Sequence, residues 1–97
     1  MAQFVTRVEL HGAVDQDYEA LHTAMEAAGF SRTVVGRNGD TYKLPTAEYY
    51  CVADTRTEVR DAAKRAAAST NCDYSVLVTE AKSIIWSGLR RITDPGR

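Results

Sequence analysis

Apolar and polar residues alternate over the first stretch of the chain, residues 4–11. The even positions are mostly apolar, whereas the odd positions from Arg7 to His11 carry a cation, a carboxylate and an imidazole. Successive side chains of a β-strand point to opposite faces, so this period of two predicts a strand with one buried face. Arg7, Glu9 and His11 are therefore expected together on the face in contact with water.

The spacing of apolar residues then becomes helical. Over residues 15–30, DQDYEALHTAMEAAGF, they recur every three or four positions, at Tyr18, Leu21, Met25 and Ala28. Asp15 is expected to cap the N-terminus of this helix. Gly29 followed by Phe30 is typical of a glycine-capped C-terminus with an apolar contact.

Two strands and a turn are expected next. Residues 31–36, SRTVVG, form a short β-branched stretch, and residues 47–54, AEYYCVAD, are rich in aromatic and β-branched residues. Asn38-Gly39 is a turn signal, so these two strands are expected to pair as a hairpin. Pro45 has no N–H to give to a sheet, so residues 41–46 are expected to form an irregular, mobile or edge segment.

A second helix is expected to begin after Thr55, because Glu58 completes a capping-box pattern three residues later. Its inward stripe consists of small side chains, namely Val59, Ala62, Ala63, Ala66 and Ala67. Asp61 and Arg65 have the spacing of an ion pair on the outer face. A fourth strand is expected over residues 74–79.

The order strand–helix–strand–strand–helix–strand predicts an α+β fold of the ferredoxin-like β-α-β-β-α-β type, with two helices over one face of a sheet. We expect one domain over residues 1–97, with its core in residues 3–80 and an apolar docking segment in residues 81–97. The stretch SIIWSGLRRI is too apolar to stay in water. It is expected to dock on its own domain or on a second copy, and the density of apolar residues around Trp86 favours a homodimer.

The composition of the chain limits which kinds of partner and compartment are expected. Twelve basic and thirteen acidic side chains give a net charge of −1, so a nucleic-acid site would have to be a local patch. Cys51 and Cys72 lack the spacing of zinc or redox motifs and are expected as free thiols, with Cys51 buried and Cys72 more accessible. The chain begins without an export signal and contains no membrane-length apolar run, so we expect a soluble cytoplasmic protein.

The expected open face carries groups for RNA cleavage. Metal-independent cleavage needs two proton-transfer groups and a cation for the phosphorane charge, and His11, Glu9 and Arg7 supply these types on one strand. The alternative is an ordinary solvated sheet face, on which Arg7 and Glu9 simply pair.

A second candidate site lies around the turn. Arg32, Arg37 and Lys43 bracket it, and with Tyr42 they offer phosphate contacts and base stacking to single-stranded RNA; the alternative is a solvated loop. No cofactor or metal is expected. The glycines of VGRNGD do not open a helix, and two histidines and two scattered cysteines have no metal-ligand spacing.

The order of elements, the GF after the first helix, the stretch LPTAEYY and the gapless run from FVTRVELHGA through DYEALHTAMEAAGF resemble the GhoS family, the antitoxins of type V toxin–antitoxin systems. The resemblance implies a ferredoxin-like fold similar to small CRISPR-associated endoribonuclease-like proteins, and an antitoxin that cleaves a toxin transcript. It places the family's acidic residue of the first strand at Glu9. It places the arginine of the first helix, associated with activity, at His22, whereas periodicity places His22 in a packing position.

The leading expectation is therefore an RNA-binding, antitoxin-like protein with endoribonuclease activity, whose catalytic candidates are Arg7, Glu9, His11 and His22. The alternative is a non-catalytic homodimeric module that binds a protein partner through Trp86 and the open sheet face. A small regulatory ligand-binding domain would share the topology, but the sequence offers no site for its ligand.

Overall fold

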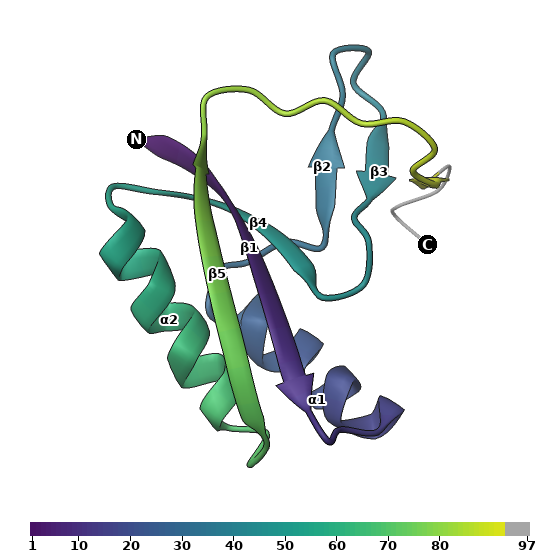
Figure 1. Ribbon diagram of the computed structural model, residues 1–97. Helices are drawn as coiled ribbons and strands as arrows, with labels where there is room; N and C mark the ends of the chain where they lie inside the picture. Colours follow the sequence, from purple (N-terminus) through teal and green to yellow (C-terminus); the bar gives the residue numbers. More distant parts are fainter. Residues whose placement is uncertain (93–97) are drawn as a thin grey trace.

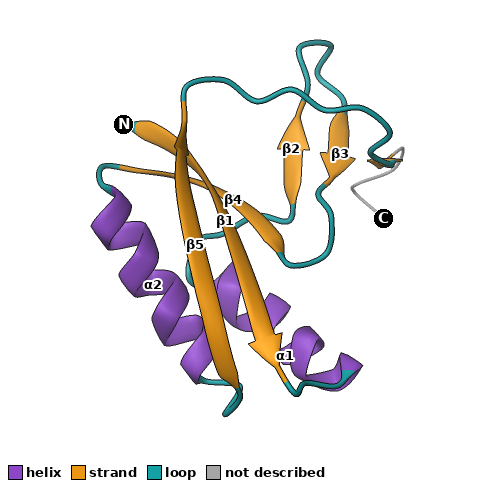
Figure 2. Ribbon diagram, in the orientation of Figure 1, coloured by secondary structure: helices purple, strands orange, loops and turns teal. Residues whose placement is uncertain are grey.

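The computed structural model describes residues 1–92, so the last five residues of the expected docking segment, 93–97, lie outside the described residues. The strands are β1 (Ala2–His11), β2 (Thr33–Val35), β3 (Thr41–Lys43), β4 (Glu48–Ala53), β5 (Asp73–Ala81) and β6 (Arg91–Ile92). The helices are α1 (Asp15–Ala27) and α2 (Arg56–Ala68). The protein has an α+β fold with two three-stranded antiparallel sheets, ordered β4-β1-β5 and β2-β3-β6 (Figures 1 and 2).

The central strand β1 sets the core of the larger sheet. It pairs with β5 from Gln3↔Ala81 to His11↔Asp73 and with β4 from Ala2↔Ala53 to Arg7↔Glu48. Its even side chains from Phe4 to Leu10 are buried and its odd side chains from Arg7 to His11 are exposed, which confirms the predicted alternation. The buried face packs against both helices, in a cluster that includes Phe4, Val8, Leu10, Leu21, Met25, Val59 and Ala63. The opposite face of this sheet is called the open face below.

The two helix starts differ in how well the sequence predicted them. Thr55 caps α2 as expected, because its Oγ1 accepts the Glu58 N–H at 3.1 Å. For α1 the prediction was wrong by one residue: Val14 is the N-cap, and its N–H donates to the Asp17 carboxylate at 3.0 Å. Asp15 instead occupies the first helical position, where a carboxylate still interacts favourably with the helix dipole.

Two further predictions concern the C-terminal cap of α1 and an ion pair on the outer face of α2. At the end of α1, Gly29 adopts φ +97° and the Phe30 N–H donates to the Met25 carbonyl at 3.0 Å, which confirms the glycine cap. The Asp61–Arg65 pair is wrong within residues 1–92, because Asp61 pairs with Arg60 at 3.1 Å.

The predicted hairpin between residues 31–36 and 47–54 is wrong. β2 pairs with β3 instead, from Thr33↔Lys43 to Val35↔Thr41, and its approach to β4 is a single bridge, Ser31↔Tyr50. The turn explains this outcome: the Gly36 N–H donates to the Asp40 carbonyl at 2.8 Å, and Gly39 adopts φ +86°. A turn this tight pairs the strand before it with the strand directly after it. Residues 41–43 are therefore a strand paired with β2, and not an irregular segment.

The C-terminal segment docks on its own chain. After β5 it crosses to the smaller sheet, where β6 pairs with β3 through Thr41↔Ile92 and Tyr42↔Arg91 (Figure 1). The Trp86 ring lies 5.4 Å from the Tyr42 ring, whereas Ile85 is 96% exposed. Among residues 1–92, no helix is both long and apolar enough to cross a membrane.

Both cysteines are free thiols. Each is only partly buried and packs at the margin of the core. The expected contrast between a buried Cys51 and an accessible Cys72 is therefore weak. Burial nonetheless raises the pKa of the Cys51 thiol, which keeps it protonated and unreactive at neutral pH.

Candidate nucleic-acid interface

Three of the four catalytic candidates lie in a row on the open face. Arg7 and Glu48 are paired at 3.8 Å, with side chains 56% and 29% exposed, so the pairing partner of Arg7 is not Glu9. His11 lies at the end of the strand, where its Nε2 is hydrogen-bonded to the Ser75 Oγ at 2.9 Å. Glu9 lies between Arg7 and His11 on the same face of the strand and is exposed. Alternate residues of a strand are roughly 7 Å apart, so the three groups line a path along the sheet.

His22, the fourth catalytic candidate, lies on the other side of the sheet. Its side chain is 6% exposed among core residues of α1, and its Nδ1 is hydrogen-bonded to the Tyr49 hydroxyl at 2.6 Å. Burial, followed by the charge of Arg32, lowers the pKa of His22, and burial raises the pKa of Tyr49 to about 12. Both groups are therefore neutral at pH 7, and the structure does not bring His22 together with Arg7, Glu9 and His11.

The four residues expected to bind RNA belong to the smaller sheet and its margins. Tyr42 and Lys43 lie on β3, Arg37 is exposed in the β2–β3 turn, and Arg32 precedes β2 and is partly buried. Tyr42 packs against Trp86, whose ring is tilted by 55° to it. Arg37 and Trp86 line the same cavity, whereas Lys43 lies on the opposite face of β3 from Tyr42.

Basic residues that the sequence analysis did not single out join this group from the C-terminal segment. Lys82, Arg90 and Arg91 are exposed, and the Arg90 carbonyl accepts the Lys43 N–H at 2.9 Å. We call residues 31–47 and 82–92 the basic sheet region. It carries six basic side chains and one acidic side chain, a net charge of +5, whereas the rest of the chain carries −6. The signal was present in LRRI, but only the β3–β6 pairing places it beside residues 31–47.

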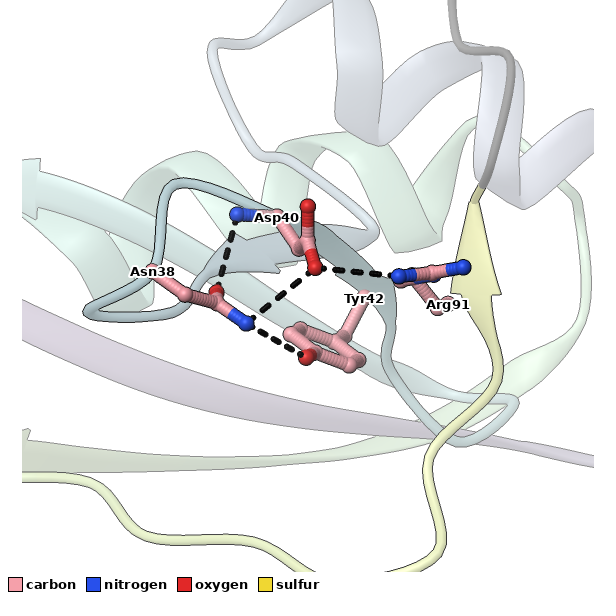
Figure 3. A network of polar contacts seen from close by, with 4 residues as sticks. All are labelled: Asn38, Asp40, Tyr42 and Arg91. Atoms are coloured by element: carbon pink, nitrogen blue, oxygen red, sulfur yellow. Dashed lines mark hydrogen bonds and ion pairs between the residues drawn. The ribbon is translucent and has the colours of Figure 1, made fainter.

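The single acidic side chain of the basic sheet region holds its turn together. Asp40 Oδ2 accepts hydrogen bonds from Asn38 Nδ2 at 3.1 Å and from Arg91 at 3.3 Å, while Asn38 Oδ1 accepts the Asp40 N–H at 3.0 Å (Figure 3). The Tyr42 hydroxyl lies 3.5 Å from the same Asn38 amide. The network fixes the turn to β6, and Asp40 pairs with one of the six cations of the basic sheet region, Arg91.

A cavity of about 560 Å³ opens between the two sheets. Its walls come from the start of β1, from Ser31 to Arg37, from Tyr50 on β4 and from residues 82–86. Volumes of this order are typical of small-molecule sites. The cavity adjoins both the open face and the basic sheet region, because Gln3 and Tyr50 belong to the former and Arg37, Lys82 and Trp86 to the latter.

No model of a known protein family matches the chain, and no curated protein matches it. Within residues 1–92, no three His, Cys, Asp or Glu side chains converge as a metal site would require. The function is therefore inferred from the arrangement of charge, aromatic rings and proton-transfer groups.

Proposed function

We propose that the protein binds single-stranded RNA through the basic sheet region. The observation that carries the proposal is a net charge of +5 in the basic sheet region, which also holds the packed rings of Tyr42 and Trp86, in a chain whose overall charge is −1. Cations neutralise phosphates, and exposed aromatic rings stack on unpaired bases without requiring a particular sequence. The opposite charge of the remaining chain orients the protein, so that RNA approaches this region first.

We further propose that the bound RNA is cleaved on the open face, as the resemblance to GhoS antitoxins implies. A base removes the proton of a ribose 2′-hydroxyl, the 2′-oxygen bonds to the adjacent phosphorus, and the 5′-oxygen leaves with a proton from an acid. His11 and Glu9 serve as the two proton-transfer groups. Arg7 stabilises the phosphorane charge, for which its guanidinium must turn from Glu48 to the phosphate.

The proposal includes a ferredoxin-like arrangement for the larger sheet and its helices. The order β4-β1-β5 with both helices packed on one face supports it, and the Ser31↔Tyr50 bridge lies where a fourth strand would continue the sheet.

The proposed site of action is the cytoplasm. Free thiols at Cys51 and Cys72 support that location, because they are typical of a reducing compartment.

RNA binding is tested by fluorescence anisotropy with a labelled, A/U-rich single-stranded RNA over a series of salt concentrations. We expect Lys43→Ala to weaken binding and to lower the salt slope by about one, because one phosphate contact is lost. Lys64→Ala on the exposed side of α2 is the matched control and should change neither. Absence of binding at low salt, or equal effects of the two variants, contradicts the proposal.

Cleavage is tested with the same RNA, in single-turnover reactions. His11→Ala and Glu9→Gln are expected to slow cleavage about a hundredfold or more with unchanged affinity, since each removes a proton-transfer group. His22→Ala is the comparison. Replacing a packing residue is expected to lower the stability of the protein and to leave the cleavage rate of the folded protein unchanged. Reaction rates that survive His11→Ala and Glu9→Gln show that these groups do not carry the chemistry.

The second candidate function is a homodimeric protein-interaction module, and one observation favours it. β5 is an edge strand of nine residues without glycine or proline, and within residues 1–92 its outer edge pairs with no strand. Exposed edges of this length usually carry features that block pairing. Leu77 lies at its centre, 64% exposed, so a two-fold axis there would pair two copies without opposing like charges.

Light scattering distinguishes this candidate. A dimer whose mass falls to that of a monomer in Leu77→Lys supports it, with Thr79→Lys as the off-centre comparison on the same face. A dimer lost in Trp86→Ala instead supports association through the C-terminal segment, as the sequence predicts. A monomer at micromolar concentration contradicts both.

A further inference from the structure

We infer that the cavity between the two sheets receives one unstacked base of the bound RNA, with the phosphate of that nucleotide at Arg37 and Lys82. The inference rests on the proposed function and specifies how RNA is held. It is carried by three features of the cavity: an aromatic wall, a fixed amide and two cations at its margin.

The aromatic wall is Trp86. Tyr42 packs against it at 5.4 Å but is not part of the cavity lining, so another part of the indole is left facing the cavity. Gly36 makes this packing tight, because a Cβ at this position would lie 3.1 Å from the Tyr42 ring and 3.5 Å from the Trp86 ring. A rigid indole is a suitable stacking platform for a base, since it loses little conformational freedom on binding.

The fixed amide belongs to Gln3. Its Oε1 accepts a hydrogen bond from the Tyr50 hydroxyl at 3.1 Å, and its Nε2 donates to the Lys82 carbonyl at 3.2 Å. A primary amide has two N–H donors and two acceptor lone pairs, so one of each is left after these contacts. An adjacent donor and acceptor match the hydrogen-bonding edge of a base, as in bidentate recognition of nucleotides by Gln.

The cations complete the site. Arg37 and Lys82 are exposed residues in the cavity lining, and the lining contains no acidic side chain. A phosphate attached to a base in the cavity therefore meets positive charge without a competing carboxylate. Gln3 also begins the row that continues along the open face to Arg7, about 14 Å further on. A base held at Gln3 would set the position of the RNA relative to Glu9 and His11.

Trp86 is the sole tryptophan of the chain, so its emission reports on the cavity directly. We titrate the whole protein with uridine 5′-monophosphate and adenosine 5′-monophosphate, exciting at the red edge of indole absorption. Saturable quenching is expected with at least one of them. Inorganic phosphate and the free nucleosides are the comparison arms, and each should bind at least tenfold more weakly than the matching nucleotide, because each lacks one half of the recognised group.

Two variants locate the site, each with a matched control. Gln3→Ala and Lys82→Ala are expected to weaken nucleotide binding about tenfold, while the exposed Gln16→Ala and Lys64→Ala leave it unchanged. Because Gln3→Ala also removes a contact of Tyr50, its near-ultraviolet circular dichroism must match that of the parent protein. Lys82→Ala keeps the backbone carbonyl that Gln3 contacts, so it tests the site even if Gln3→Ala alters the fold.

The outcomes separate this inference from the proposed function. RNA binding without nucleotide quenching, or with Gln3→Ala and Lys82→Ala no weaker than their controls, overturns the cavity as a base site and leaves RNA binding intact. Quenching by inorganic phosphate equal to that by nucleotides overturns base recognition. Failure to bind both RNA and nucleotides contradicts the inference and the proposed function together.

Discussion

At the scale of single residues, the environment of His22 decides between two interpretations of the same position. Resemblance places a functional group at His22 and periodicity places a packing group there. The structure buries His22 against the Tyr49 hydroxyl, on the opposite side of the sheet from His11. His11 is exposed at the end of a strand. Two histidines 11 positions apart thus have different environments, because strand alternation exposes one and the apolar stripe of α1 buries the other.

The buried histidine makes stability depend on pH. Because burial lowers the pKa of His22 below its ordinary value of 6.5, the unfolded chain binds a proton that the folded protein resists. Stability from this residue is therefore complete above about pH 6.5, and it declines as the pH falls toward the lowered pKa of the folded state. We expect the melting temperature to drop between pH 7 and pH 5.

Thermal melts of His22→Gln and His11→Gln over this pH range check the prediction. The first substitution should flatten the pH dependence, and the second, at an exposed position, should leave it as in the parent protein. A parent protein whose melting temperature is constant from pH 7 to pH 5 would contradict the assignment of a buried neutral imidazole.

At the scale of elements, local signals determined what the sequence predicted correctly. The alternation in β1, the Thr55 cap of α2 and the Gly29 cap of α1 all act between residues close in sequence, and all three are confirmed. The hairpin prediction is wrong because it gave more weight to the strand propensity of residues 47–54 than to the tight turn. Such a turn pairs the two strands that directly flank it, here β2 and β3. The two-residue strand β6 lacked a local signal, since it forms only by pairing with β3.

The cap of α2 gives a quantitative expectation for an element. The Thr55 hydroxyl satisfies the Glu58 N–H and also donates to the Glu58 carboxylate at 3.1 Å. Thr55→Ala should therefore lower the free energy of unfolding by about 1 kcal/mol. Chemical denaturation measures the change. Thr57→Ala, within the first turn and exposed, is the control and should be neutral or slightly stabilising, because alanine has the higher helix propensity.

At the scale of the whole molecule, the charge distribution was the feature least accessible to sequence reasoning. The overall charge of −1 indicates only that any nucleic-acid site must be local. The pairing of β6 with β3 joins two basic segments separated by more than thirty residues of balanced or acidic sequence. Of the candidate residues, Arg32, Arg37, Tyr42 and Lys43 were found from the turn. Lys82, Trp86, Arg90 and Arg91 joined them only through tertiary structure.

The most direct test of RNA binding by the basic sheet region is a nuclear magnetic resonance titration. The ¹⁵N-labelled protein is mixed with short A/U-rich single-stranded RNA at low salt, using His11→Ala if the parent protein cleaves it. We predict that amide shifts concentrate in residues 31–47 and 82–92 and extend from Gln3 along the open face to His11, while the exposed face of α2 is unaffected. Shifts centred on α2, or no shifts at saturating RNA, would contradict the account.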